Sequence, residues 1–561
     1  MSLRLLRYAP WRCILSCQVG AVCGGRMGRE PVGGELPMLT VARAAARALL
    51  KDLPDHSDIG GVCINLNYFE NREVASFKAR LAALAVHDRN YWLGTLYTLM
   101  MSPADRRAQA AYFTPPYLAN AVIDMALDHG FDMEKHDVLD PAAGGAAFLS
   151  LIADRMCRAG ISREDIADRL NGIEIDERLA RISEFLIAEQ LEGFRSRQIV
   201  RVGDSIHTQT DESYDLVVAN PPYGRIRPDE LAKERWSKVA YSNHINKYAV
   251  FTELCLRVAT TGGLVALVIP SSFRGGPLYD RMRSFVASQG QILALGTVTN
   301  RADVFADVAQ DVSVLLVRKG APHRAKQPVK FPAITGAGVS HPVPAGLLPK
   351  DMSSPWLAGT DARKDRGGAT LSDYGVSAKA GYFVWNREWD RICDPEDEQA
   401  YPLFWAKNVR AKSLCRPLNR SGDGIDFVRV PPGSTAIVDG PAAIVQRVTN
   451  SSQPRRIVAA TVDRDSIVPW KGFVSENHTI VLSAADATDL DLLVSLLNTK
   501  AVDERYRAVS GTATVSVTLL RELDLPSPHA FRAALQRTDD IEEAAVIAYR
   551  NGNVQSFSEA S

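Results

Sequence analysis

The sequence contains no apolar run approaching the roughly 20 residues that a membrane-spanning helix requires. It has eight cysteines but no CxxC pair and no Cys/His cluster, so neither a zinc site nor a disulfide framework is predicted. Scattered cysteines of this kind fit reduced thiols in the cytoplasm. The 65 Lys and Arg residues equal the 65 Asp and Glu residues, so the net charge neither supports nor excludes a nucleic-acid partner. We therefore expect a cytoplasmic protein without a bound metal.

The chain has 561 residues, which predicts two to four units at about 100–200 residues each. We expect a disordered extension over 1–38, with Met27 or Met38 as alternative starts. After it we expect a helical segment over 39–110, an α/β domain over 111–320 and a linker over 321–369. An α+β domain over 370–530 and a C-terminal helix and tail over 531–561 complete the chain. The linker is inferred from its proline and glycine content.

The α/β domain alternates short apolar segments with helical segments, which predicts a doubly wound, mostly parallel, Rossmann-like sheet. Seven strands are expected, at 136–140, 171–176, 199–204, 214–223, 262–270, 292–298 and 311–319. Strands covered by helices on both faces form continuous apolar runs, as most of these do.

A loop of small residues, PAAGGA, follows Asp140 at the end of the first strand and leads into a helix. In doubly wound sheets, ligands bind beyond the carboxyl ends of the strands. Small residues let a cofactor approach the backbone, and the N-terminus of the next helix favours a negative group such as a carboxylate. The spacing is not GxGxxG, and no Lys–Ser/Thr pair of a phosphate loop follows. The glycines could instead serve only a tight turn between strand and helix.

Acidic residues also follow the second and third strands. Glu174, in GIEID, lies where a carboxylate usually holds a ribose diol, and Asp204, in GDS, could accept a proton from an adenine amino group. Any exposed strand end can carry an acid, so these residues are informative only in combination.

The most specific motif is NPPY, residues 220–223, at the end of the fourth strand. Two prolines fix the backbone and remove two N–H donors. The side-chain oxygen of Asn220 and the carbonyl of Pro221 are both acceptors, which could together hold the two hydrogens of an exocyclic amine. Such contacts would localise the lone pair of the amine, which could then attack the methyl group of a sulfonium donor. Tyr223 would stack on the target ring.

Taken in order, YFTPPY (112–117), DPAAGGAAFL, GIEID, GDS, NPPYG and NKYAVF (246–251) resemble the TaqI-like, gamma-class adenine-N6 DNA methyltransferases of restriction-modification systems. The resemblance implies S-adenosylmethionine as cofactor, double-stranded DNA as substrate, and base flipping. The implied cofactor-binding residues are Thr114, Asp140, Ala142, Gly144, Glu174, Asp204 and Ser205, with Ile175 and Phe251 on the two faces of the cofactor adenine. The implied catalytic residues are Asn220, Pro221, Tyr223 and Phe305, the last being a second residue that packs on the flipped base.

The loop after the first strand departs from the family at two positions. Ala143 stands where the family frequently has cysteine, and Ala146 replaces a glycine. If position 146 requires a positive φ, alanine is unfavourable there.

The domain over 370–530 is where the DNA sequence would be recognised. Segment 401–470 has an excess of basic residues, and Arg, Lys and Gln are the side chains that recognise base edges or phosphates. The candidate DNA-binding residues are Lys407, Arg410, Gln446, Arg447 and Arg455. For each of them, an ordinary solvated surface position is the competing interpretation.

Several alternatives stay open. A cytosine-N4 methyltransferase uses the same amine chemistry, although Ser or Asp usually replaces the Asn in its motif. Enzymes that methylate protein glutamine or ribosomal RNA share NPPY, but they generally lack a large domain after the catalytic one. A bifunctional restriction enzyme would need a metal-binding Asp…Glu-x-Lys set, of which residues 39–110 offer no convincing version. A purely DNA-binding subunit would not need NPPY. We expect a monomer, with a cognate endonuclease, if there is one, acting separately.

Overall fold

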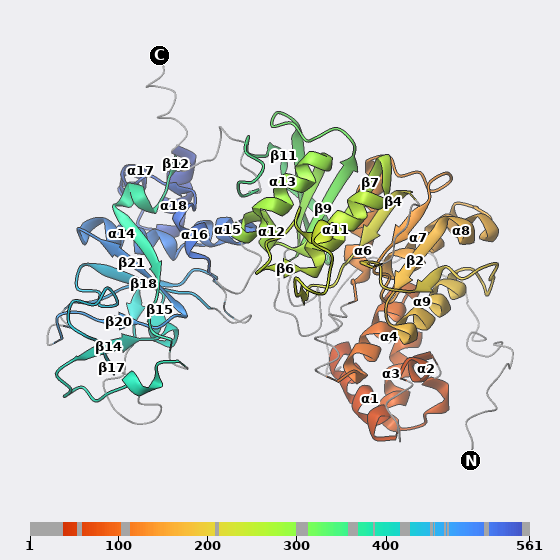
Figure 1. The fold of residues 1–561 in the computed structure, drawn as a ribbon, viewed down its shortest axis with the longest axis horizontal. Coiled ribbons are helices and arrows are strands. Elements are labelled where there is room, and N and C mark those ends of the chain that lie inside the picture. The colour runs from red at the N-terminus through yellow and green to blue at the C-terminus, as the bar shows by residue number, and fades with distance from the viewer. Residues whose placement is uncertain are drawn as a thin grey trace.

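The protein is represented by a computed structural model, in which a central sheet domain lies between an N-terminal helical unit and a C-terminal α+β domain (Figure 1). The structure describes residues 37–52, 59–64, 66–102, 113–207, 213–298, 312–356, 368–384, 387–415, 427–448, 453, 455–464, 467, 470–509 and 515–551, apart from a few side chains.

The sheet domain is built on nine strands in the order β11-β10-β8-β9-β7-β4-β1-β2-β3. The strands are β1 (Val138–Asp140), β2 (Leu170–Glu174), β3 (Val200–Val202), β4 (Tyr214–Ala219), β7 (Ala259–Pro270), β8 (Gly290–Val298), β9 (Val312–Lys319), β10 (Pro328–Thr335) and β11 (Gly338–Leu347). Strands β3, β2, β1, β4 and β7 are parallel, whereas β9 lies antiparallel between β7 and β8. The predicted mostly parallel α/β sheet is confirmed.

Two of these strands correct the sequence interpretation, because β10 and β11 lie within the stretch expected to be a linker. β10 pairs with β8 in parallel and with β11 in an antiparallel hairpin, so the sheet has nine strands rather than seven. Proline is tolerated at strand ends and bulges, and Pro332 stands between Phe331 and Ala333, where the register with β11 shifts. The proline content that suggested a linker therefore marks an irregular strand near the edge of the sheet.

Helices cover both faces of this sheet. They are α6 (Pro116–Asp128), α7 (Ala147–Arg158), α8 (Arg163–Arg169), α9 (Glu177–Gln190), α11 (Lys247–Val258) and α13 (Asp280–Gln289). Successive strand residues point to opposite faces, so Leu216 and Val218 pack in the core with α6 and α7, while Val217 and Ala219 pack in the core with α11 and α13. Burial on both faces explains why β4 is apolar along nearly its whole length.

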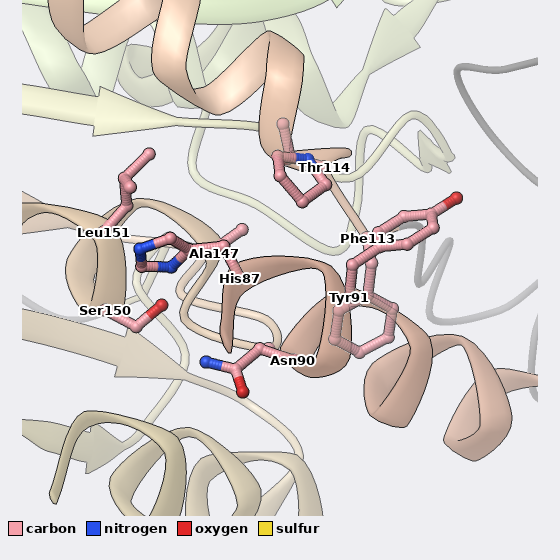
Figure 2. A pocket seen from close by; sticks show the side chains of 10 residues that line it. His87, Asn90, Tyr91, Phe113, Thr114, Ala147, Ser150 and Leu151 are labelled. Carbon is pink, nitrogen blue, oxygen red and sulfur yellow. The ribbon is translucent and has the colours of Figure 1, made fainter. Parts of the chain in front are cut away.

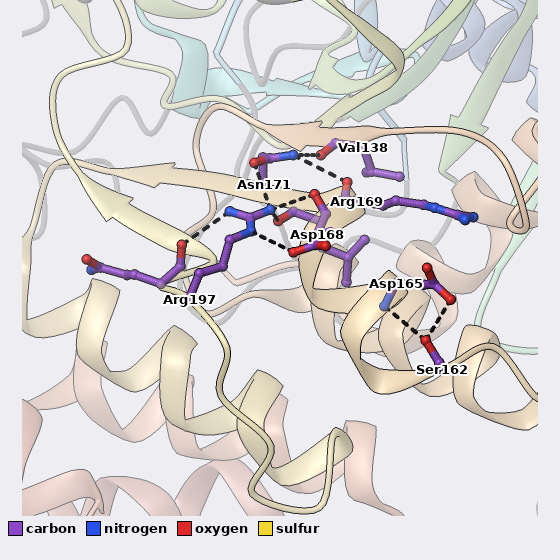
Figure 3. Close-up of polar contacts among 9 residues, drawn as sticks. Val138, Ser162, Asp165, Asp168, Arg169, Asn171 and Arg197 are labelled. Carbon is purple, nitrogen blue, oxygen red and sulfur yellow. Dashed lines mark hydrogen bonds and ion pairs between the residues drawn. The ribbon is translucent and has the colours of Figure 1, made fainter.

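The amino ends of β1 and β2 are tied to the chain that leads into β3. Arg197 donates from Nη2 to the carbonyl oxygens of Asp168 and Leu170 and to the side chain of Asn171 (Figure 3). Asn171 in turn donates to the carbonyl of Val138 in the neighbouring strand. These contacts lie at the opposite end of the strands from the residues of the candidate site, so they stabilise the sheet rather than form the site.

The N-terminal unit consists of α1 (Met38–Asp52), α2 (Ile59–Ile64), α3 (Arg72–Ala82) and α4 (Val86–Met100). Its core is continuous with the sheet domain, because it includes Leu179, Ile182 and Leu186 of α9. Arg89 of α4 also pairs with Glu189 of α9 through atoms 2.7 Å apart. The helical unit is thus attached directly to the helix that follows β2.

The C-terminal domain combines an antiparallel sheet with a cluster of helices. The sheet contains β13 (Val376–Ala380), β21 (Thr479–Ala484), β18 (Ala442–Gln446) and β19 (Ala459–Thr461), and a second sheet contains β17 (Phe427–Arg429), β14 (Ala400–Phe404) and β20 (Val474–Ser475). The helices are α14 (Thr488–Leu497), α15 (Lys500–Val509), α16 (Val517–Arg521), α17 (Pro528–Leu535) and α18 (Ile541–Asn551).

The expected boundary at residue 530 does not separate a domain from its tail. Ala544, Ala548 and Tyr549 of α18 are buried in the same core as Leu482 and Leu496. The amphipathic pattern of 541–551 therefore belongs to the domain itself. Residues 1–36 of the extension expected over 1–38, and the last residues of the tail, 552–561, lie outside the described residues, whereas Met38 begins α1.

Candidate active site

The predicted motifs meet at one edge of the sheet. β1 lies between β4 and β2, and all three run parallel, so their carboxyl ends lie side by side. Asp140 and Glu174 are the last residues of β1 and β2, and Asn220 directly follows β4. The strand order therefore brings the two acids and the amide to the same edge, as expected for a doubly wound sheet.

Asp140 and Glu174 are buried carboxyl groups. Asp140 Oδ1 accepts a hydrogen bond from the Ala142 backbone at 3.0 Å, and Glu174 accepts from the backbone amides of Gly144 and Asp176, each at 2.9 Å. Burial, reinforced by the nearby charge of Glu174, raises the pKa of Asp140 to about 8. Burial also raises the pKa of Glu174. Among the described residues, no Lys, Arg or His forms an ion pair with either group, so burial favours their protonated form until a cation binds beside them.

The loop after β1 has the backbone conformation that the sequence put in question. Ala146 has φ 55° and ψ 31°, in the left-handed region, and Gly144 has φ 52°. An alanine in this conformation costs about 1–2 kcal/mol, so the position does require the positive φ that makes alanine unfavourable. Phe113 packs against Gly145 and Gly94 so closely that a Cβ atom on either glycine would overlap its ring. The loop is thus held between α7 and the segment that precedes α6.

The side chain of Asn220 is oriented by two hydrogen bonds. Its Nδ2 donates to Thr114 Oγ1 at 3.1 Å, and its Oδ1 accepts from the hydroxyl of Tyr223 at 2.8 Å. An amide oxygen has two lone pairs, so one hydrogen bond from Tyr223 does not by itself saturate an amide oxygen. Thr114 was expected to cover the cofactor, and the structure places it in contact with the predicted catalytic amide.

Aromatic rings surround Tyr223. Its ring meets that of Tyr248 edge to face at 6.3 Å between centroids, and Tyr248 stacks on Tyr279 at 5.8 Å. Tyr248 is buried on α11, and its hydroxyl is 3.2 Å from Ser272 Oγ. Tyr248 lies in the motif NKYAVF, and no role was expected for it from the sequence. A signal for Tyr248 was present in the sequence, because this residue belongs to NKYAVF, one of the motifs that carry the family resemblance.

The residues predicted to enclose the cofactor adenine have contrasting surroundings. Ile175 is 63% exposed, whereas Phe251 is 6% exposed and belongs to the core with Leu139 and Ile173. Asp204 Oδ2 lies 2.8 Å from His207 Nδ1, and this hydrogen bond raises the pKa of His207. The enclosure of the cofactor adenine by Ile175 and Phe251 stays a prediction.

Of two further predicted site residues, the structure describes Ser205 but not Phe305. The hydroxyl of Ser205 donates to the carbonyl of Pro141 at 2.5 Å, which links the chain after β3 to the loop after β1. Phe305, the second residue expected to pack on the target base, lies outside the described residues.

A hydrogen bond that was not expected from the sequence supports the loop after β2, which follows Glu174. The hydroxyl of Tyr97, on α4, donates to Asp176 Oδ2 at 2.9 Å, and Asp176 caps α9 by accepting from the backbone of Arg178. The backbone amide of Asp176 in turn donates to Glu174. The helical unit therefore helps to hold the predicted ribose-binding residue in place.

The predicted DNA-binding residues separate into exposed and structural positions. Lys407 and Arg410 are exposed on one turn, where Arg410 Nη1 donates to the Lys407 carbonyl. Arg447 is half-buried and donates to the carbonyl of Asn477 at 3.0 Å, and Arg455 pairs with Glu542 at 2.6 Å. These four assignments stay predictions.

Gln446 corrects the sequence interpretation. It is 4% exposed, and its Nε2 donates to the carbonyls of Ala406 and Val409. Its amide is therefore committed to holding the turn that carries Lys407 and Arg410, so it cannot reach a base edge. It follows four buried residues of β18, where a glutamine is retained because its amide is satisfied internally.

Comparison with known proteins identifies the family of the sheet domain. Residues 89–340 match the family described as N-6 DNA Methylase. These residues form an N-6 DNA methylase domain. The matched segment begins within α4 and ends in β11, so it contains both buried acids and the complete NPPY motif.

Relatives from bacteria are similar over most of the chain. The type II methyltransferase M.BsuBI of Bacillus subtilis is 23% identical over 454 residues, covering 74% of this chain and 87% of the relative. The type II methyltransferase M.PstI of Providencia stuartii is 22% identical, covering 61% and 71%. Among solved structures, the type IIL restriction-modification enzyme MmeI in complex with DNA has a TM-score of 0.49 at 12% identity, covering 87% of this chain and 81% of that chain.

The methylase domain transfers a methyl group from S-adenosylmethionine to the N6 amino group of adenine in DNA. The site fits this cofactor, because two buried carboxyl groups without a cationic partner among the described residues suit a ligand that carries a sulfonium, an ammonium and a ribose diol. No helix in the described part of the chain is long and apolar enough to cross a membrane. The described residues also contain no group of three or more His, Cys, Asp or Glu that could hold a metal ion.

Proposed function

We propose that the chain is the modification enzyme of a type II restriction-modification system, which methylates one adenine within a short DNA sequence. The observation that carries this proposal is the position of Asn220, whose amide lies at the carboxyl end of β4 beside the strands that end in Asp140 and Glu174. The type II relatives support it, because M.BsuBI matches 74% of this chain, which is more than the segment 89–340 that matches the methylase family.

In this proposal, Asn220 and Pro221 activate the target amine. The lone pair of an aromatic amine is delocalised into the ring, so the amine is a poor nucleophile. Asn220 Oδ1 and the Pro221 carbonyl accept its two hydrogens, which favours a tetrahedral nitrogen with a localised lone pair. The cofactor supplies an electrophilic methyl group bound to a sulfonium. Thr114 keeps the Asn220 amide oriented with Nδ2 away from the amine, because Nδ2 donates to its hydroxyl.

The target adenine must leave the duplex to reach these acceptors, which costs a few kcal/mol of stacking and pairing. Stacking on an aromatic side chain contributes about 1–3 kcal/mol per base and can offset that cost. Tyr223 is partly buried and donates a hydrogen bond to Asn220, which suits it for this role. Phe305 is the second predicted stacking residue.

The C-terminal domain would recognise the DNA sequence, with Lys407 and Arg410 as the exposed basic residues of one turn. The resemblance to modification methyltransferases implies that a cognate endonuclease, if there is one, acts separately. We accordingly predict that the chain is a monomer and that a cognate endonuclease, where one exists, is a different protein. A mass measurement by light scattering during gel filtration tests the first point.

Methylation-aware sequencing of DNA from cells that express the chain tests the proposed function. We expect N6-methyladenine in one short motif and its loss in the Asn220→Ala variant. Asn67→Ala, which changes an exposed asparagine of the helical unit, is the matched control and should retain methylation. Modified cytosine, or methyl transfer to RNA or protein alone, would contradict the proposal.

A further inference from the structure

A short two-stranded ribbon directly follows the NPPY motif. It consists of β5 (Arg225–Ile226) and β6 (Ile245–Asn246), which pair antiparallel. Gly224 is the one residue between the motif and β5, and its carbonyl accepts from the backbone of Lys247 at 2.8 Å. The ribbon therefore begins beside the residues proposed to bind the target base and ends where α11 begins.

The ribbon is fixed to the aromatic rings around Tyr223. Asn246 Nδ2, in β6, donates to the hydroxyl of Tyr279 at 2.9 Å, and the His244 ring meets the Tyr279 ring edge to face at 5.4 Å between centroids. Tyr279 stacks on Tyr248, which in turn contacts Tyr223. A side chain on the ribbon is thus held at a set position relative to the base proposed to stack on Tyr223.

Arg225 is an exposed cation of this ribbon that the fold does not use. Its guanidinium forms no ion pair or side-chain hydrogen bond with the residues that the structure describes. Arg227, two positions later, is by contrast paired with Glu230 through atoms 2.6 Å apart. Burial lowers the pKa of His244, and the charge of Arg225 lowers it further. His244 is therefore uncharged at neutral pH, and Arg225 carries the positive charge of the ribbon.

Lys247 places a second cation at the same turn. A Cβ atom added to Gly224 would lie 3.6 Å from Cδ and Cε of Lys247 and 4.0 Å from its Nζ, so the ammonium group lies beside the backbone of the turn. The acid near it is Glu230: hydrogen bonds from Arg227 lower the pKa of Glu230, and the charge of Lys247 adds to that effect. The turn after NPPY is thus flanked by two positive side chains.

The other side of Asn220 is closed by protein. Its Nδ2 donates to Thr114, which is buried. Figure 2 shows the pocket beyond Thr114, which Phe113 lines together with Asn90 and Tyr91 of α4. The space in it that is open to the centre of a water molecule is about 10 Å³, which is enough for about one water and far too small for a nucleotide. DNA must therefore reach Asn220 from a different direction.

The ribbon lies on the side from which DNA would arrive. In Figure 1, β6 lies on the side of the sheet domain nearer the C-terminal domain, whereas α4 lies on the far side. The C-terminal domain is the part proposed to recognise the DNA sequence. A duplex held there brings the backbone of the target strand to the ribbon as the flipped adenine reaches Asn220.

We propose that Arg225 binds a DNA phosphate beside the flipped adenine, at a turn where Lys247 adds a second positive charge. The proposal rests on the proposed function, because it names a DNA-binding residue of the same site. A flipped nucleotide rotates about its backbone, so its two flanking phosphates stay next to it and meet a cation placed beside the base acceptors. A guanidinium binds phosphate through two parallel hydrogen bonds, and such contacts fix the position of the DNA without recognising its sequence. Arg225 would thereby hold the extruded nucleotide in register with Asn220.

Methylation kinetics on chemically modified DNA test the proposal. The substrates are duplexes that carry the motif found by sequencing, either unmodified or with one neutral methylphosphonate on the 5′ or the 3′ side of the target adenine. We expect Arg225→Gln to lower kcat/KM for unmodified DNA about tenfold, because a hydrogen bond between two charged groups is lost. On one of the two modified duplexes the parent protein should lose a similar factor. Arg225→Gln should lose no more than about twofold from the same modification, because two changes at one contact are not additive.

Arg227→Gln is the matched control, because Arg227 is an exposed arginine two positions away that is paired with Glu230. It should stay within about threefold of the parent protein on unmodified DNA, and each methylphosphonate should cost it as much as it costs the parent. Calorimetry should show that Arg225→Gln binds S-adenosylmethionine as the parent does, and its melting temperature should be unchanged because the replaced side chain is exposed.

Three outcomes would overturn the proposal. They are additive losses for Arg225→Gln on both modified duplexes, equal effects of Arg225→Gln and Arg227→Gln, and a loss of cofactor affinity in Arg225→Gln as large as its loss of kcat/KM. A parent protein that methylates no adenine in DNA would instead refute the proposed function itself.

Discussion

The hydroxyl of Tyr223 donates to Oδ1 of Asn220 at 2.8 Å, so the ring proposed to stack on the target base also holds the oxygen proposed to activate it. The contact joins two residues of one turn, three positions apart, and the same hydroxyl lies 3.4 Å from the Val268 carbonyl. Base binding and amine activation are therefore coupled through one phenol. Substitutions at Tyr223 can separate the contribution of its ring from that of its hydroxyl.

Tyr223→Phe keeps the ring and removes the hydroxyl, whereas Tyr223→Ala removes both. We expect Tyr223→Phe to reduce kcat by no more than about tenfold, the loss of one hydrogen bond, and Tyr223→Ala to reduce kcat/KM for DNA by a further factor of roughly 10–100 through lost stacking. Fluorescence of 2-aminopurine at the target position measures flipping, and calorimetry measures cofactor affinity. A loss of cofactor affinity as large as the loss of flipping in Tyr223→Ala would contradict the stacking role.

Thr114 is expected to act by orienting Asn220. Thr114→Val removes the oxygen that accepts from Asn220 Nδ2 while preserving the shape of the side chain, so kcat should fall by about 3–10-fold with little change in the KM for DNA. Thr114→Ser retains the oxygen and should restore most of the rate. If Thr114→Ser were as impaired as Thr114→Val, packing of the γ-methyl group would be the cause instead.

Asp140 should make cofactor binding dependent on pH. Its pKa in the folded protein is about 8, so the carboxyl is mostly protonated at pH 6, and binding of a cationic ligand has to release that proton. The affinity should therefore increase as the pH rises from 6 toward 8 and level off above it. Because the α-amino group of the ligand titrates near pH 8 as well, the informative quantity is the difference between the parent protein and Asp140→Asn.

The same shift predicts how the stability of the ligand-free protein depends on pH. A carboxyl group whose pKa is raised on folding stabilises the folded state most below its usual pKa near 4, and that contribution is lost as the pH rises to about 8. Asp140→Asn should consequently raise the melting temperature at pH 8 more than at pH 5. An equal effect at both pH values would mean that Asp140 is already ionised in the folded protein.

Substitution of Lys407 or Arg410 should affect DNA binding, whereas substitution of Gln446 should affect the stability of the fold. Lys407→Ala and Arg410→Ala are expected to weaken DNA binding, and each should lower the slope of log affinity against log salt by about one where the side chain neutralises a phosphate. Gln446→Ala should instead lower the free energy of unfolding by about 1–3 kcal/mol, because two buried carbonyls lose their donor. Urea unfolding and salt-dependent binding distinguish the two outcomes.

Local sequence was sufficient for the catalytic half of the protein because its signals are carried by contiguous residues. A strand followed by NPPY, or by an acid and small residues, is a motif of about ten contiguous residues that predicts a function by itself. The parallel strand order then brings the carboxyl ends of these strands together. The positive φ required at Ala146 could be foreseen for the same reason. The stretch 321–369 was wrongly expected to be a linker, because its proline content suggests a loop. Pairing of Lys330 with Ala294 in β8, far earlier in the chain, instead makes residues 328–335 a strand.

The sequence by itself determined the chemistry of the methylase edge and the type of sheet that carries it, since both depend on short motifs and on hydrophobic periodicity. Only the tertiary structure decided which polar side chains are satisfied within the fold. Gln446 and Asn90 are both buried amides, yet one is satisfied by two backbone carbonyls and the other faces a cavity without a partner. That difference depends on residues distant in the chain, such as α7 for Asn90, so no local pattern could reveal it.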